Sequence, residues 1–166
     1  MKKLLLLSIG IVALGLMTQA QDYKSAIGGR LGTTYYDVFT ASYKTFITEP
    51  GALEFNAGVG GKKYDHDYRT FAVTASAAYQ HHFPIGNIAG FKWYVGGGLM
   101  IYNATSDYDR LKGFGFGVFP TGGVDYKIGN IPLDVSADIR PTIFIAAPGY
   151  YNSYYSNFGI AARYTF

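Results

Sequence analysis

The segment from residue 158 to 166 constrains the fold of this chain more than any other. Alternate residues on one side are apolar or aromatic: Phe158, Ile160, Ala162, Tyr164 and Phe166. The residues between them are small, polar or charged: Gly159, Ala161, Arg163 and Thr165. A period of two residues predicts a β-strand whose faces meet different environments. The aromatic face runs to the last residue, so we expect an apolar medium on that side.

The same alternation recurs along the rest of the chain. We expect strands at residues 25–33, 38–47, 53–61, 70–83, 91–103, 114–128, 133–146 and 157–166. Each is near or above the about 9–11 residues that a tilted strand needs to cross a bilayer. Short turns rich in proline and glycine alternate with connections that are mostly longer and richer in charge or tyrosine. The pattern predicts an all-β fold, an eight-stranded antiparallel up-and-down transmembrane β-barrel with short periplasmic turns and longer extracellular loops.

Nearly all charged strand residues fall on one face of the predicted sheet. The inward face is expected to carry Arg30, Ser42, Lys44, Glu54, Asn56, Ser76, Gln80, His82, Asp125, Lys127, Asp134, Ser136, Asp138, Arg140 and Arg163. Apolar residues such as Phe55, Val73 and Leu99 take the outward face. An outward Arg or Lys at mid-bilayer would cost about 2–4 kcal/mol, and the pattern avoids that cost. A soluble lipocalin-like barrel, whose interior is apolar, is therefore excluded.

The inward charges can have one of two roles. Seven of them are expected to form a lumen charge network: Arg30, Lys44, Glu54, Asp125, Asp138, Arg140 and Arg163. Buried charges are tolerated when they are paired. The near balance of sign favours a hydrogen-bonded plug that fills the lumen, and a polar pathway through the barrel is the alternative.

Turn geometry predicts the pairing of two strands. A turn centred between residues 130 and 131 places Lys127 opposite Asp134 and Pro120 opposite Pro141. Proline has no backbone N–H to donate, and a closed barrel has no free edge for it. We therefore expect a bulge or local widening at the two prolines. It would either re-aim the outer halves of the strands or leave a lateral gap for a lipid chain.

The N-terminal segment has the features of a secretory signal peptide. A basic start at Lys2 and Lys3 precedes an apolar run and a small-x-small site at residues 18–20. We expect residues 1–20 to be the signal peptide and residues 21–166 the barrel. Without Lys2 and Lys3, the 14 Lys and Arg of the whole chain nearly balance its 11 Asp and Glu, so we expect no nucleic-acid partner. The absence of cysteine excludes disulfides and thiolate metal sites.

These features together resemble one class of membrane protein. The signal segment, the eight alternating strands and the ending Arg163-Tyr164-Thr165-Phe166 are similar to the small eight-stranded Gram-negative outer-membrane β-barrels, of the general type of the outer-membrane-protein-A transmembrane domain. The resemblance implies an outer-membrane location and a lumen filled by side chains. It also implies an assembly signal at Tyr164 and Phe166 for the barrel-assembly machinery, and contact with outer-membrane lipids and lipopolysaccharide. It implies no catalytic activity.

Aromatic and histidine residues outside the lumen supply further candidates. An aromatic girdle at the periplasmic interface is expected from Tyr79, Phe83, Trp93 and Tyr126. Candidate loop contacts to a surface partner are His66, Tyr150, Tyr151, Tyr154 and Tyr155. Tyrosine supplies rigid amphipathic contact area, although burial in the outer-leaflet belt would also explain these tyrosines. We expect no cofactor and no metal, because His66 beside Asp65 and Asp67 on an exposed loop is better explained as solvated.

Two classes of function remain open. The first is a non-enzymatic outer-membrane protein with a structural or surface-interaction role through its extracellular loops. The second is a lipid-modifying enzyme of the lipid A deacylase or acyltransferase type, which needs a Ser or Asp beside a His at the outer rim. His81 and His82 fall near the periplasmic end, and His66 has no assignable Ser partner. The non-enzymatic function is therefore favoured, and no catalytic residue is assigned.

Overall fold

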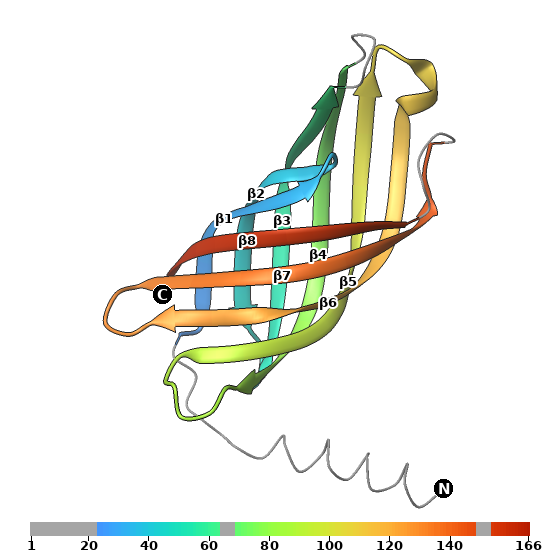
Figure 1. The fold of residues 1–166 in the computed structure, drawn as a ribbon. Helices are drawn as coiled ribbons and strands as arrows, with labels where there is room; N and C mark the ends of the chain where they lie inside the picture. The colour runs from blue at the N-terminus through green and yellow to red at the C-terminus, as the bar shows by residue number, and fades with distance from the viewer. Residues whose placement is uncertain (1–22, 64–68, 149–153) are drawn as a thin grey trace, which may run out of the picture.

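The computed structural model describes residues 23–63, 69–148 and 154–166. Within these residues, eight antiparallel strands close into a barrel in which each strand pairs with its sequence neighbours and the first pairs with the last. The strands are β1 (Ser25–Thr34), β2 (Asp37–Phe46), β3 (Gly51–Lys63), β4 (Arg69–Pro84), β5 (Phe91–Ser106), β6 (Gly113–Ile128), β7 (Leu133–Ala146) and β8 (Tyr154–Thr165) (Figure 1). A short 3₁₀ helix, η2 (Asp109–Leu111), lies between β5 and β6.

The predicted fold class is confirmed. The expected strands are all present, and their bounds agree within three residues. The largest differences are at the extracellular ends, where β5 continues to Ser106 and β8 begins at Tyr154. In the described part of the chain, no helix is both long and apolar enough to cross a membrane.

The barrel has a polar interior and an apolar exterior. Along β4, Thr74 and Gln80 are buried in the lumen, whereas the preceding residues Val73 and Tyr79 turn outward. The same alternation holds on β3, where Glu54 is buried and Phe55 is exposed. The predicted assignment of the strand faces is thus confirmed.

The register of β6 against β7 agrees with the expected turn. Lys127 lies opposite Asp134, and the pairing runs regularly up to Gly122 opposite Ile139. The ladder is then interrupted and resumes in the same register at Val118 opposite Ile143. The two prolines lie in this interruption, as expected from their missing donors.

The predicted bulge is not at the prolines. The register shift between β6 and β7 lies between Phe116 and Gly117, closer to the extracellular end. Two facing prolines remove donors from both strands without adding a residue to either, so the ladder opens there and the register is kept.

The extracellular end of the barrel is uneven. The hairpin of β1 and β2 turns at Tyr35 and Tyr36, and β3 to β6 extend well beyond it (Figure 1). The strands expected at residues 25–33 and 38–47 left an extracellular connection at residues 34–37, but the observed turn contains only Tyr35 and Tyr36. Thr34 and Asp37 belong to the strands, and the side chains of Tyr35 and Tyr36 are buried rather than exposed.

Candidate functional site

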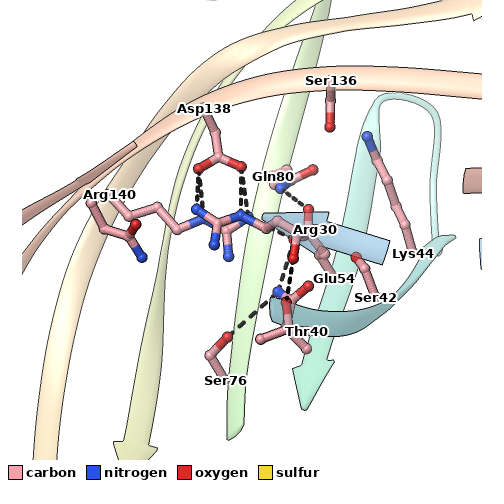
Figure 2. Close-up of polar contacts among 12 residues, drawn as sticks. Arg30, Thr40, Ser42, Lys44, Glu54, Ser76, Gln80, Ser136, Asp138 and Arg140 are labelled. Carbon is pink, nitrogen blue, oxygen red and sulfur yellow. Dashed lines mark hydrogen bonds and ion pairs between the residues drawn. The ribbon is translucent and has the colours of Figure 1, made fainter. Parts of the chain in front are cut away.

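The lumen is filled by a network of buried ion pairs (Figure 2). Arg30 on β1 lies between two carboxylates: its Nη1 donates to Asp37 Oδ2 at 2.7 Å, and its Nη2 donates to Asp138 Oδ1 at 2.6 Å. Arg140 donates to both oxygens of the same Asp138 at 3.1 and 3.0 Å. A Cβ at position 159 would collide with the Arg30 guanidinium, so Gly159 gives this side chain its space.

Glu54 is the centre of the network. Its carboxylate accepts hydrogen bonds from Arg140 Nη2 at 2.6 Å, Gln80 Nε2 at 2.6 Å and Asn56 Nδ2 at 2.8 Å. Arg163 Nη2 forms an ion pair at 3.1 Å with Glu54 Oε2, the oxygen that also accepts from Gln80. Because β3, β4, β7 and β8 all contribute, the carboxylate links strands from opposite sides of the barrel.

The periplasmic half of the lumen contains a second group of charges. Lys44 pairs with Asp125, and His82 Nε2 lies 3.1 Å from the same carboxylate. The His82 ring lies between the rings of Phe46 and Tyr94, with centroids at 4.9 and 5.1 Å. Lys44 lies opposite Glu54 in the ladder, but its ion pair is with Asp125 across the lumen.

The structure places all seven residues predicted for the network in buried ion pairs, and Asp134, Asp37 and Asn157 are among their further partners. Asp134 Oδ2 accepts a hydrogen bond from Arg163 Nη1 at 3.3 Å. Asp37 Oδ2 accepts hydrogen bonds from Arg30 Nη1 and, at 2.6 Å, from Asn157 Nδ2. Asp134 was assigned to the inward face and could have been included. Asn157 lies an even number of residues before Arg163 on β8, so the alternation of the strand already predicts an inward side chain for it. Asp37 was missed because the turn before it was predicted to be longer.

Lys127 does not belong to the network although it was assigned to the inward face. Its Nζ donates to the backbone carbonyls of Ile128, Gly129 and Ile131 at 3.2, 3.1 and 2.7 Å. The side chain therefore stabilises the periplasmic turn between β6 and β7. A lysine so near a turn has backbone acceptors within reach and does not need a lumen carboxylate.

Aromatic side chains close the extracellular mouth of the lumen. The Tyr36 ring stacks on Tyr102 with a centroid distance of 5.5 Å and meets Phe144 edge-on at 5.3 Å. Tyr35 packs against Tyr36 and Tyr155, and its hydroxyl donates to Tyr102 at 3.2 Å. We call these five residues the aromatic mouth. The sequence did not predict it, because alternation in strands does not tell where the side chains of a turn point.

The candidate loop contacts have different outcomes. Tyr154 is exposed, whereas Tyr155 is half-buried in the aromatic mouth. His66, Tyr150 and Tyr151 lie outside the described residues, as does the expected signal peptide.

The predicted girdle residues lie on the outward face. Tyr79, Trp93 and Tyr126 are exposed there, and Phe83 stacks on Trp93 at 4.5 Å. Tyr164 and Phe166 also point outward. These residues come from the parts of β4, β5 and β6 that adjoin the short turns and from the C-terminal end of β8, so they lie on the outward surface near the periplasmic end.

The described histidines are both near the periplasmic end. His81 faces outward, with Nδ1 at 3.2 Å from the Tyr79 hydroxyl, and His82 is buried as described above. Within residues 23–63, 69–148 and 154–166, no group of His, Cys, Asp and Glu side chains has a geometry that could hold a metal. At the extracellular loop between β5 and β6, Lys112 donates to Asp109 at 2.7 Å, and this hydrogen bond lowers the pKa of the Asp109 carboxyl.

Comparisons with known proteins identify the fold. No protein-family model and no curated protein sequence matches the chain. Among solved structures, the outer-membrane enzyme PagL superposes with a TM-score of 0.51 and 12% identity, over 85% of this chain and 99% of PagL. Neisserial surface protein A has a TM-score of 0.48 and 17% identity, over 86% of this chain and 95% of that protein. Ail of Yersinia pestis has a TM-score of 0.49 and 11% identity, over 88% of this chain and all of Ail. At these identities the likeness is one of fold alone, that of the small eight-stranded outer-membrane barrels.

Proposed function

We propose that this chain is an integral outer-membrane protein with a filled lumen and a structural or surface-interaction role at its extracellular end. The observation that carries the proposal is the distribution of polarity. The buried interior holds ion pairs such as Arg30 with Asp138, and the exposed exterior holds side chains such as Phe55 and Leu99. In water this arrangement would expose large apolar surfaces, whereas in a bilayer the outward face meets lipid.

The filled lumen supports a role other than transport. Side chains of Arg30, Glu54 and Arg163 are each at most 1% exposed. Arg163 pairs with Glu54, and Arg30 pairs with Asp138, across the barrel. The aromatic mouth closes the extracellular end above them. An eight-stranded barrel is just wide enough to be filled in this way.

The extracellular wall supports a surface role. The outer ends of β3 to β6 project beyond the β1–β2 hairpin (Figure 1). Arg69 on β4, Phe114 on β6 and Arg110 on η2 are exposed side chains of mixed character at this end. Exposed aromatic and arginine side chains are enriched where proteins contact one another. Tyr154 at the start of β8 adds to the same end.

An outer-membrane location requires export, assembly and contact with lipids. This proposal includes export by residues 1–20, recognition of Tyr164 and Phe166 by the barrel-assembly machinery, and contact with lipopolysaccharide. The lipid-modifying alternative requires a histidine with a Ser or Asp at the extracellular end. His81 and His82 lie at the other end, so no described residue favours that alternative.

The proposal is tested by comparing cells that express the protein with cells that lack it. We expect the protein in the outer-membrane fraction with heat-modifiable migration on a gel, and lipid A of unchanged mass in both cell types. Loss or gain of an acyl chain on lipid A that depends on the protein would show the enzymatic alternative. Recovery of the folded protein in the soluble fraction would contradict the membrane location.

A further inference from the structure

A cleft lies beside the tip of the short β1–β2 hairpin. Pairing of β2 with β3 stops at Val59, although β3 continues to Lys63. Pairing of β1 with β8 stops at Gly159, although β8 begins at Tyr154. The hairpin therefore leaves a notch in the wall, which forms a cleft of about 360 Å³ between the hairpin tip, the end of β3 and the start of β8.

The lining of the cleft combines three kinds of chemical group. Tyr35 and Tyr155 contribute aromatic surface, and Lys62 contributes an ammonium group. Ser156 contributes a hydroxyl. Rings, a hydroxyl and a cation within one cleft suit a phosphorylated sugar, because rings cover its apolar face, the hydroxyl pairs with its oxygens and the ammonium group pairs with phosphate.

An apolar groove begins directly below the cleft on the outward surface. Thr33 lines the cleft, and Leu31, the next outward residue of β1, lines a groove of about 670 Å³. The floor of the groove is formed by the small residues Gly29 and Ala162, which are paired in the ladder. Leu31 and Phe39, also paired, form its wall.

The direction of the groove decides whether a second copy of this chain or an acyl chain can occupy it. It follows a ladder row and is therefore oblique to the membrane normal, since strands in such barrels tilt by about 35–45°. On two barrels related by a twofold axis along the normal, such rows would cross at a large angle. A ridge of a second copy could not follow the groove, whereas a flexible acyl chain can.

We propose that the cleft binds the phosphorylated sugar headgroup of an outer-leaflet glycolipid of the lipid A type, with one acyl chain in the groove below. This inference rests on the proposed outer-membrane location, which places the hairpin tip at the outer leaflet. Lys63 and Arg69, which lie opposite each other beyond Lys62, add positive charge to the same strand ends. Asp65 and Asp67, which come between them in sequence, lie outside the described residues.

The test measures binding of lipids to the purified, folded full chain in detergent by native mass spectrometry. The probes are bisphosphorylated lipid A, dephosphorylated lipid A and phosphatidylglycerol. We expect bisphosphorylated lipid A to bind about tenfold more tightly than either other lipid, the effect of one charge-assisted contact. Lys62→Glu and the cleft-filling Ser156→Trp should each remove most of this preference. Arg110→Glu is the matched control, because Arg110 is an exposed extracellular cation on η2 that does not line the cleft.

Heat-modifiable migration establishes that each variant is folded before binding is compared. Equal affinity for lipid A and phosphatidylglycerol would overturn the proposal, and so would equal effects of Lys62→Glu and Arg110→Glu. Either result would leave the membrane location intact, since that is tested by fractionation. A wild-type protein that fails to reach the outer membrane would instead contradict the proposed function itself.

Discussion

Replacement of Glu54 by alanine is expected to lower the free energy of unfolding of the barrel by about 3–5 kcal/mol. The carboxylate is buried and accepts hydrogen bonds from Arg140, Gln80 and Asn56 while pairing with Arg163. Its removal leaves two guanidinium groups with one fewer counter-charge each in a site shielded from water. Asp138 and Asp134 still pair with them, which keeps the loss within this range.

The measurement is urea unfolding of the protein in lipid vesicles. Glu54→Gln should lose less stability than Glu54→Ala, because the amide keeps the shape and one acceptor. Asp109→Ala is the control, since Asp109 and Lys112 form an exposed ion pair and its loss should leave the midpoint unchanged. Planar-bilayer recordings should show that Glu54→Ala opens no conducting pore. Large, stable currents from the wild-type protein would contradict the filled lumen.

Deletion of Phe166 is expected to remove most of the folded protein from the outer membrane. Two effects act together. The outward Phe166 ring belongs to the ending that we expect the assembly machinery to recognise. Its backbone also closes the barrel, because Phe166 N–H donates to the Ser25 carbonyl at 2.8 Å and Ser25 N–H donates to the Phe166 carbonyl at 2.9 Å.

Substitution separates these two effects. Phe166→Ala keeps both backbone hydrogen bonds and removes only the ring, so a loss of assembly in this variant assigns the effect to recognition. Ile131→Ala removes an exposed apolar side chain from a periplasmic turn and should have no effect. The readout is the amount of heat-modifiable protein in the outer-membrane fraction. Unchanged assembly of the Phe166 deletion would count against the barrel assignment.

Much of the fold could be predicted from the sequence, because a barrel wall obeys local rules. Side chains alternate with period two, so the positions of Phe55 and Asn56 within β3 determine which of them meets lipid. A short turn then sets the register, as Lys127 opposite Asp134 shows. Prolines at 120 and 141 located the interruption of the ladder, although not the bulge nearby.

The candidate site was less predictable, because contacts across the lumen depend on three-dimensional geometry. Lys44 and Glu54 are neighbours in the ladder, but Lys44 pairs with Asp125 on β6. A long side chain in a narrow lumen can reach several strands, and sequence spacing does not choose between them. The aromatic mouth was missed for a related reason, since the inward direction of Tyr36 follows from the shortness of its hairpin.

The central claim is that the outward face of the barrel meets lipid while the inward face meets neither lipid nor bulk water. The chain has no cysteine, so single cysteines can be placed along β4 and spin-labelled in a lipid bilayer. Labels at Val73, Ala75 and Ala77 should collide with dissolved oxygen and not with a water-soluble nickel complex. Labels at Thr74 and Ser76 should be shielded from both. Collisions of the outward labels with the nickel complex, or accessibilities without a period of two, would contradict the account.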